Sequence, residues 1–292
     1  MTLSEILHFG RAAEKLRIAQ PALTQHIQRL ERELGVQLFD RGPRNVSLTP
    51  VGKEFLTEAR RVLAQVERAV LVAVRAQRGE VGRLEISYMG SMAYSGILPE
   101  LLAAYEDIAP NVSVGLLEAD QEFQISYLEE GRTDIALVRL PLGKLPEGIS
   151  TIVVKKERVV ACLRKGHRLS GKSINLPELK DEPFLTTHLK EGQGFYDTAL
   201  HICRTAGFEP QVASRSHQFA TIVGLVGAGR GIALVPESVI KLAVPGVVYE
   251  ELVGELPTSD VAIAFRSEGN SPATNRFIEL CFKLYHQAAS HW

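Results

Sequence analysis

Cysteine is scarce in this chain, which has 292 residues and only three cysteines. Cys162, Cys203 and Cys281 are odd in number and lie far apart, whereas disulfide-stabilised secreted domains carry even sets of cysteines. The pattern therefore favours buried free thiols in a reducing compartment.

Long apolar runs are also absent. No stretch approaches the roughly 18 apolar residues that a membrane-spanning helix needs. The N-terminus, MTLSEILHFGRAAE, lacks the basic-then-apolar order of a secretion signal. We therefore expect a cytoplasmic protein with no membrane partner.

The chain has no excess of charge of either sign, since 33 basic and 34 acidic side chains give a net charge of −1. The distribution is uneven, however. Up to Glu80 there are 13 Lys and Arg against 9 Asp and Glu, which leaves 20 against 25 in the remainder. A basic N-terminal part followed by an acidic body is typical of a DNA-binding head joined to a separate domain.

Catalytic and cofactor motifs are missing too. The chain contains no G-x-S-x-G and no H-E-x-x-H, and its eight histidines show no metal-ligand spacing. The glycine-rich segment 224–231 has Ile232 where G-x-G-x-x-G requires its third glycine, and this segment ends a helix instead of opening one. We therefore expect no enzyme, no cofactor and no metal site.

Residues 10–56 predict two short helices, a tight turn and a small hairpin. Pro21 occupies a first-turn position, which a helix tolerates because that N–H would lack a partner anyway. Apolar residues at spacings of three and four predict one buried stripe on the second helix. The expected apolar residues are Ala12, Ala13, Leu16 and Ile18 on the first helix, and Leu23, Ile27, Leu30 and Leu34 on the second.

The opposite face of the second helix is polar. Its Thr, Gln and Arg side chains suit the base edges and phosphates of a DNA major groove, although a solvated helix face is the alternative. Two features favour DNA: the N-terminus of the helix is free of bulky apolar groups, and a basic hairpin, FDRGPRNVSL, follows directly.

The segment RAAEKLRIAQPALTQHIQRLERELGVQLFDR, followed by LTPVG, resembles the winged helix-turn-helix of LysR-type transcriptional regulators. The resemblance covers both helices, the wing and the start of the next helix. It implies that residues 1–57 bind a partly palindromic stretch of double-stranded promoter DNA. In this family a full helix usually precedes the segment similar to LHFGRAAEKL, and here only Met1–Leu7 stand in its place, so that helix is expected to be shortened.

The polar face assigns the DNA-binding residues. We predict that Thr24, Gln25 and Gln28 contact bases, because their side chains can donate and accept along base edges. Five further residues are predicted to lie towards phosphates: Gln20, Pro21, Arg29, Arg41 and Arg44. Relatives often have Ser-Arg in place of Thr24-Gln25, so their base preference does not transfer.

A long helix is expected to begin at Thr49-Pro50 and to form a linker over residues 49–78. A coiled-coil-like seam of apolar residues runs along it, formed by Phe55, Ala59, Val62, Val66, Ala69 and Ala73. No neighbouring helix in the sequence can cover this seam, which predicts a dimer, with packing against its own head as the alternative. Residues 79–82 are expected to form a hinge.

From Arg83 onwards strands alternate with helices, which predicts the α/β class with a doubly wound parallel sheet. The apolar segment Val153–Leu163 is expected to cross from lobe I (82–155 and 260–292) to lobe II (156–259). Two such lobes resemble periplasmic solute-binding proteins, the fold of the LysR-type effector domain. The whole chain is thus expected to be an all-α winged helix-turn-helix with a linker helix, followed by a two-lobed effector-binding domain over 82–292.

The effector is expected in the cleft, beyond the carboxyl ends of strands, where helix N-termini favour a carboxylate. Ser91 follows the first strand and opens a helix, although a simple helix cap is the alternative. The resemblance adds Asp120 and Gln121, from the loop before the second helix. The remaining candidates follow strands or lie at helix starts, and the two phenylalanines could equally be core: Met92, Thr187, His188, Phe195, Gln218 and Phe219.

The sequence therefore predicts a LysR-type regulator controlled by a small-molecule effector, expected to be a carboxylate. The resemblance implies a homodimer, a homotetramer of two dimers, and contact with RNA polymerase. A solute-binding protein without DNA function is the main alternative, and the basic head and missing export signal oppose it. An enzyme on the two-lobed fold is opposed by the lack of a nucleophile–base constellation.

Overall fold

The computed structural model describes residues 1–42 and 46–286. The chain divides into two compact units, Met1–Val74 and Arg75–Trp292. Among the helices of the described residues, none combines the length and the apolar character needed to span a membrane.

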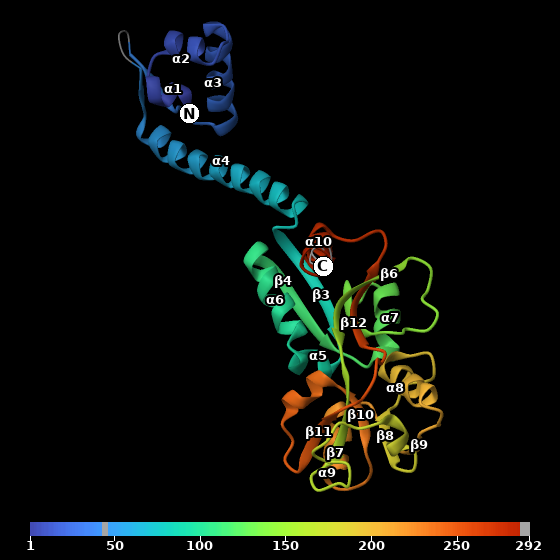
Figure 1. Cartoon of the computed structure of the whole chain (residues 1–292). Helices are drawn as coiled ribbons and strands as arrows, with labels where there is room; N and C mark the ends of the chain where they lie inside the picture. Colours follow the sequence, from blue (N-terminus) through green and yellow to red (C-terminus); the bar gives the residue numbers. More distant parts are fainter. Residues whose placement is uncertain (43–45, 287–292) are drawn as a thin grey trace. The chain divides into compact units, whose positions relative to one another are not determined.

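The first unit is a helical head with a two-stranded hairpin (Figure 1). Its elements are α1 (Thr2–Ile6), α2 (Phe9–Lys15), α3 (Gln20–Leu34), β1 (Phe39–Arg41), β2 (Val46–Leu48) and α4 (Pro50–Gln77), which continues into the second unit. The strands are antiparallel, with Phe39 opposite Leu48. The predicted winged helix-turn-helix is confirmed, with a first helix of only five residues.

The core of the head is small. It consists of Leu3, Ala12, Ala13, Leu23, Leu38 and Phe39. The sequence prediction was wrong for Leu16, Ile18 and Leu34, which are 43%, 40% and 41% exposed. Leu16 and Ile18 lie beyond the last residue of α2, and Leu34 ends α3, so the apolar stripes run past the core.

The start of α4 is fixed by a cap and a close backbone approach. Thr49 Oγ1 accepts a hydrogen bond from Gly52 N (2.9 Å), which confirms Thr49 as the N-cap. A β-carbon on Gly52 would lie 2.1 Å from the carbonyl oxygen of Leu38. Only glycine therefore allows the helix to pack this closely against the chain that leads into β1.

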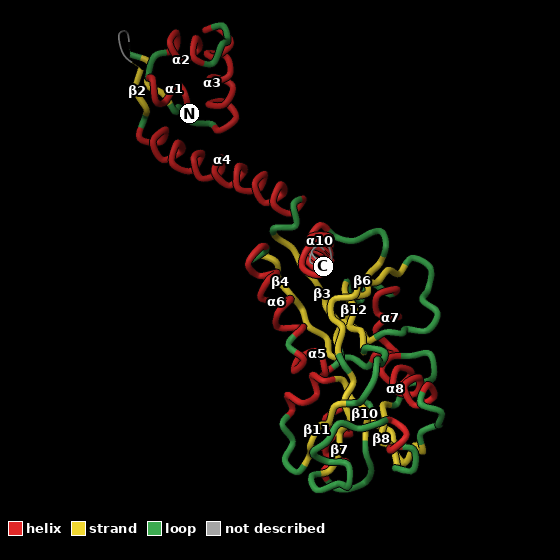
Figure 2. The backbone as a smooth tube through the Cα atoms, in the orientation of Figure 1, coloured by secondary structure: helices red, strands yellow, loops and turns green. Residues whose placement is uncertain are grey.

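Lobe I of the second unit is a five-stranded sheet with helices on both faces (Figure 2). The strand order is β4-β3-β5-β12-β6. Its elements are β3 (Val81–Tyr88), α5 (Gly90–Ser95), α6 (Ile97–Ile108), β4 (Asn111–Glu118), α7 (Gln121–Glu129), β5 (Ile135–Arg139), β6 (Ile149–Glu157), β12 (Ser259–Arg266) and α10 (Pro272–His286). Leu101 of α6 and Phe277 of α10 pack in the core on one face, and Leu128 of α7 packs on the other.

The α/β class is confirmed, but the prediction of a parallel sheet was only partly right. β3 pairs in parallel with β4 and β5, whereas β12 pairs antiparallel with β5 and β6. Because β12 comes from lobe II, it starts beside Arg139, where β5 ends, and runs in the opposite direction.

Lobe II packs its helices against antiparallel and parallel strand pairs. Its elements are β7 (Val159–Arg164), η1 (Leu176–Leu179), β8 (Pro183–Thr187), α8 (Gly194–Thr205), β9 (Gln211–Ser216), α9 (Phe219–Gly227), β10 (Ala233–Pro236), η2 (Glu237–Leu242) and β11 (Val247–Glu251). The predicted crossing over Val153–Leu163 is divided at Arg158, with β6 in lobe I and β7 in lobe II. The sequence prediction did not include β11, which is short and half-buried.

All three cysteines are free and buried, as predicted. Cys162 and Cys203 lie in the core of lobe II, and Cys281 lies in the core of lobe I. Burial raises the pKa of each thiol to about 12. These thiols are therefore protonated at neutral pH and are poor nucleophiles.

Candidate functional site

The predicted DNA-facing side of α3 is open to solvent. Five of its predicted residues are exposed: Gln20, Pro21, Gln25, Gln28 and Arg29. Thr24 is half-buried, and its hydroxyl donates a hydrogen bond to the Gln20 carbonyl (3.0 Å). Gln25 and Gln28 therefore present their amides more freely than Thr24 presents its hydroxyl.

The wing is tied to α3 by an ion pair. Arg41 Nη2 lies 2.8 Å from Glu31 Oε2, and the Arg41 guanidinium lies 5.4 Å from the ring centroid of Phe9. The other oxygen of Glu31 accepts hydrogen bonds from the backbone N–H groups of Leu38 and Phe39 (2.9 and 3.1 Å). Arg41 thus has a structural contact besides its predicted phosphate contact. Arg44 lies outside the described residues.

The predicted dimerisation seam on α4 divides into two parts. Phe55 packs against the core of the head, as the alternative interpretation predicted for the whole seam. Further along the seam, Val62 and Val66 are 62% and 55% exposed, and Val70, which lies beside the seam, is 60% exposed. This chain therefore leaves the distal part of the seam uncovered.

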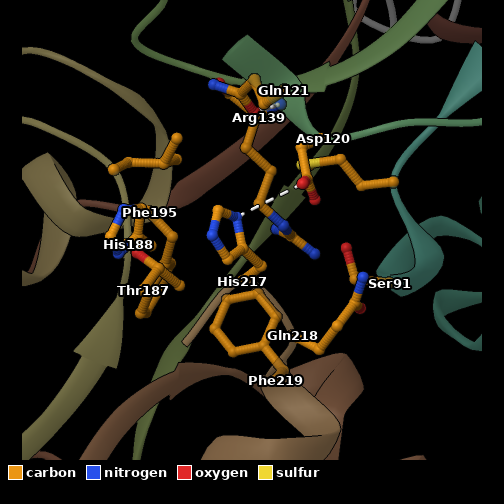
Figure 3. Close-up of a pocket in the computed structure, with 12 residues that line it drawn as sticks. Ser91, Asp120, Gln121, Arg139, Thr187, His188, Phe195, His217, Gln218 and Phe219 are labelled. Carbon is orange, nitrogen blue, oxygen red and sulfur yellow. Dashed lines mark hydrogen bonds and ion pairs between the residues drawn. The ribbon is translucent and has the colours of Figure 1, made fainter. Parts of the chain in front are cut away.

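A cavity lies between the two lobes, and its empty space of about 500 Å³ includes the opening to solvent. Eight of the nine predicted effector residues line it: Ser91, Asp120, Gln121, Thr187, His188, Phe195, Gln218 and Phe219. Figure 3 shows Ser91 on one side of the cavity and Thr187, His188 and Phe195 on the opposite side. Residues more than one hundred positions apart in the sequence are thus brought together.

Two details of the predicted site at α5 were wrong. Met92 does not line the cavity, because it lies one position round the helix and is fully buried in the core of lobe I. Ser91 is not a helix cap, because the N-cap residue is Met89. The Ser91 hydroxyl is buried in the cavity wall and has no hydrogen-bond partner in the described part of the chain.

Gln121 lines the cavity, but both polar atoms of its side-chain amide already form hydrogen bonds within the protein. Its Nε2 donates to the carbonyl of Arg139, and its Oε1 accepts from the backbone N of Arg139, both at 2.9 Å. This pair of hydrogen bonds joins the start of α7 to the end of β5. Gln121 therefore shapes the wall more than it offers free hydrogen-bonding groups.

Arg139 is a cavity residue that the sequence analysis missed. Its side chain is buried, with Nη1 donating to Ser259 Oγ (2.8 Å) and Nη2 lying 2.7 Å from Glu157 Oε2. Glu157 also accepts from Ser238 (3.1 Å) and lies 3.2 Å from Lys155 Nζ. Burial raises the pKa of Glu157, but Arg139, Ser238 and Lys155 outweigh it, so the pKa is below its usual value.

Three buried donor groups of the cavity wall lack partners in the described residues. They are Ser91 Oγ, Thr187 Oγ1 and Arg139 Nε. A buried polar group without a partner costs free energy, about 1–3 kcal/mol, so such groups in a native fold require an explanation.

The lobe II side of the cavity has an aromatic wall. Phe195 of α8 and Phe219 of α9 are buried, with ring centroids 5.3 Å apart in an edge-on arrangement (76°). Both rings therefore belong to the core of lobe II and also line the cavity.

The rim of the cavity carries ionisable groups from both lobes. His217 Nδ1 lies 3.3 Å from Asp120 Oδ2, and the rings of His217 and His188 are 4.5 Å apart (Figure 3). Glu122 lies beside Asp120, and ligand atoms of Asp120, Glu122 and His217 lie within 4.8 Å of one another. The lobes thus meet at this rim through polar side chains.

Sequence signals existed for some of the missed residues. Arg139 ends a strand that is otherwise wholly apolar, Ile135–Val138, and a charge at the end of a buried strand is unusual. Asp120 was predicted through the resemblance, whereas His217 carried no such signal, because only the packing of lobe II against lobe I brings it beside Asp120.

Comparison with known proteins gave matches over nearly the whole chain. Residues 1–53 match the family model described as bacterial regulatory helix-turn-helix protein, lysR family, and residues 77–284 match the LysR substrate binding domain. The regulator AlsR of Bacillus subtilis is 34% identical over 281 residues, covering 96% of this chain and 92% of AlsR. ClcR of Pseudomonas putida is 32% identical, covering 96% and 95%.

Comparison with solved structures also gave matches over nearly the whole chain. Full-length CbnR in complex with its target DNA matches with a TM-score of 0.83 and 27% identity, over 97% of this chain and 96% of CbnR. Full-length BenM matches with a TM-score of 0.61 and 30% identity, over 99% of this chain and 95% of BenM.

Proposed function

The chain belongs to the LysR family of bacterial transcriptional regulators, and from this membership we propose that a small carboxylate effector controls its action at a promoter. The effector would bind in the cavity between lobes I and II. The proposal has three parts, which concern the DNA, the assembly and the effector.

The DNA-binding part of the proposal rests on α3 and the wing. Exposed Gln25 and Gln28 would contact base edges in the major groove, and Gln20, Arg29 and Arg41 would lie towards phosphates. CbnR, which this chain resembles over its full length, was crystallised with its target DNA.

The assembly part rests on the distal half of α4. Val62, Val66 and Val70 are exposed and share one helix face, so a second copy of α4 would bury them. We propose a homodimer through this seam, two dimers in a homotetramer, and RNA polymerase as the partner at the promoter.

The carboxylate part rests on one observation: Ser91 Oγ, Thr187 Oγ1 and Arg139 Nε are buried donors without partners around a single cavity. A carboxylate accepts several hydrogen bonds and would satisfy all three groups.

The cavity also limits the rest of the effector. Phe195 and Phe219 give one side an apolar wall, so the body of the molecule would be apolar. The empty space of about 500 Å³ includes open solvent, so the enclosed part of the cavity is smaller and admits only a small molecule.

Calorimetric titration of the full chain tests this proposal. Small mono- and dicarboxylic acids are compared with their primary amides, and an acid is expected to bind while its amide does not. Ser91→Ala and Thr187→Val should each weaken binding about ten- to a hundredfold, because each removes one hydrogen bond to a charged group.

Thr186→Val is the matched control, because Thr186 is adjacent in β8 but does not line the cavity. It should leave the affinity unchanged. Equal binding of acid and amide, or wild-type affinity in both the Ser91 and Thr187 variants, would overturn the carboxylate assignment.

A further inference from the structure

Three side chains of metal-ligating type meet at the rim of the cavity. Asp120 and Glu122 stand at the start of α7 in lobe I, and His217 lies between β9 and α9 in lobe II. One ligand atom of each lies within 4.8 Å of the other two. This cluster joins the two lobes at the rim of the same cavity, but it does not include Ser91, Thr187 or Arg139, the three donors of the carboxylate site proposed above.

The usual reason for an acidic residue before a helix does not apply to Asp120. It is the N-cap residue of α7, but its side chain makes no capping hydrogen bond. The carboxylate is turned to His217 instead, with Oδ2 3.3 Å from Nδ1 (Figure 3). Glu122 has no ion pair within the described residues. Two carboxylates are therefore left with a single imidazole between them.

The spacing fits a metal ion. Zn–N and Zn–O bonds of about 2.0–2.2 Å place neighbouring ligand atoms of a tetrahedral site about 3.3–3.6 Å apart. The distance of 3.3 Å between His217 Nδ1 and Asp120 Oδ2 agrees with one edge of such a site. Glu122 is exposed, so its side chain can rotate to complete the set at little cost.

We propose that Asp120, Glu122 and His217 bind a divalent transition-metal ion of the Zn²⁺ type at the cavity rim. Two carboxylates balance the charge of one divalent cation, and the imidazole favours Zn²⁺ over Mg²⁺ or Ca²⁺, which prefer oxygen ligands alone. His188 is exposed, and its ring lies 4.5 Å from that of His217, so it supplies a fourth ligand if it turns.

Such an ion would connect the lobes directly. Asp120 and Glu122 belong to lobe I and His217 belongs to lobe II, so full coordination requires the lobes to be closed. An ion that binds the closed form more tightly shifts the population towards that form.

Titration of the full chain with zinc chloride, after removal of metal by a chelator, tests the site. Calorimetry should show one saturable ion per chain, and magnesium chloride should give none. Asp120→Asn, Glu122→Gln and His217→Ala should each weaken zinc binding about tenfold or more. Co²⁺ in place of Zn²⁺ should give absorption bands of a coordinated ion, and His217→Ala should abolish them.

His201→Ala is the control, because His201 is an exposed histidine on α8 outside the cluster. It should bind zinc as the wild type does. The proposal is overturned if zinc does not saturate, if the His217 variant binds zinc as tightly as the wild type, or if the His201 variant loses as much affinity. All these variants change exposed or half-exposed side chains, and circular dichroism checks that each remains folded.

Discussion

Arg41 of the wing and Glu31 of α3 are joined by an ion pair of 2.8 Å, and Glu31 also accepts two backbone hydrogen bonds from the start of the wing. The same arginine is therefore placed for two tasks. It holds the wing against α3, and its half-exposed guanidinium remains within reach of a phosphate.

Removing Arg41 should weaken binding to every DNA sequence alike. Arg41→Ala is expected to lower the salt dependence of the affinity by about one phosphate contact, whereas Gln25→Ala should relax the preference at one base position. Fluorescence anisotropy with the mapped promoter site and an unrelated duplex, at several salt concentrations, measures both effects.

Glu31→Gln separates the two tasks of Arg41, because it removes the ion pair and keeps the positive charge. If the phosphate contact matters, this variant should retain the salt dependence that Arg41→Ala loses. Wild-type affinity and selectivity in both the Arg41 and Gln25 variants would show that the helix and wing are wrongly assigned.

A charge in the α4 seam should break the dimer. Val66→Asp places a carboxylate where a second chain is expected, which costs several kcal/mol if the group stays buried. Sedimentation should show loss of the dimer, and tight promoter binding should be lost with it. Arg68→Asp introduces the same residue off the seam and should leave assembly intact. An unchanged oligomer in the Val66 variant would remove α4 from the interface.

The buried pair of Arg139 and Glu157 predicts a pH dependence of stability. The pKa of Glu157 is lowered in the folded state, so its contribution to stability is present above the ordinary carboxyl range. This contribution is lost as the pH falls through the lowered value. Glu157→Gln should cost about 3–5 kcal/mol at neutral pH and weaken the pH dependence of stability below the ordinary range.

Urea unfolding at neutral pH and at a series of acidic pH values checks this expectation. Ser238→Ala is the control, since it removes one hydrogen bond to Glu157 and keeps both charges. It should cost about 1 kcal/mol and reduce the pH dependence only in part, because Arg139 and Lys155 still lower the pKa of Glu157. Equal stability of the wild type and Glu157→Gln at neutral pH would contradict the argument.

Gly52→Ala should destabilise the head. Its β-carbon would lie 2.1 Å from the Leu38 carbonyl, so the start of α4 would have to move, at a cost above about 2 kcal/mol. Gly224→Ala in α9 meets nothing within 4 Å and should instead stabilise by about 0.5–1 kcal/mol. Scanning calorimetry of the full chain measures both changes, and a neutral Gly52 variant would refute the close approach.

Local patterns predicted the elements of this chain well. Leu23 and Ile27 mark the inner face of α3, and Thr49 marks the start of α4. At the cavity, Ser91 follows β3 and Thr187 is the last residue of β8. Each of these predictions depends on near neighbours in the sequence, where helix periodicity and capping act directly.

Predictions that depend on distant contacts did less well. The antiparallel direction of β12 follows from the path through lobe II, which periodicity does not encode. Met92 is apolar and adjacent to Ser91, yet one step along α5 turns it into the core. Arg139 meets Glu157 and Ser259 only because β5 and β6 end, and β12 begins, at the same edge of the sheet.

The rate at which a reagent labels the buried thiols would report local unfolding of this protein. A thiol-reactive reagent requires both access and a thiolate, and the folded chain denies it both at Cys162, Cys203 and Cys281. Labelling of Cys162 or Cys203 therefore records each time lobe II unfolds locally, and labelling of Cys281 records the same for lobe I. Met1–Val74 contains no cysteine, so local unfolding of the head does not change the labelling. The labelling rate therefore measures unfolding of the effector domain alone.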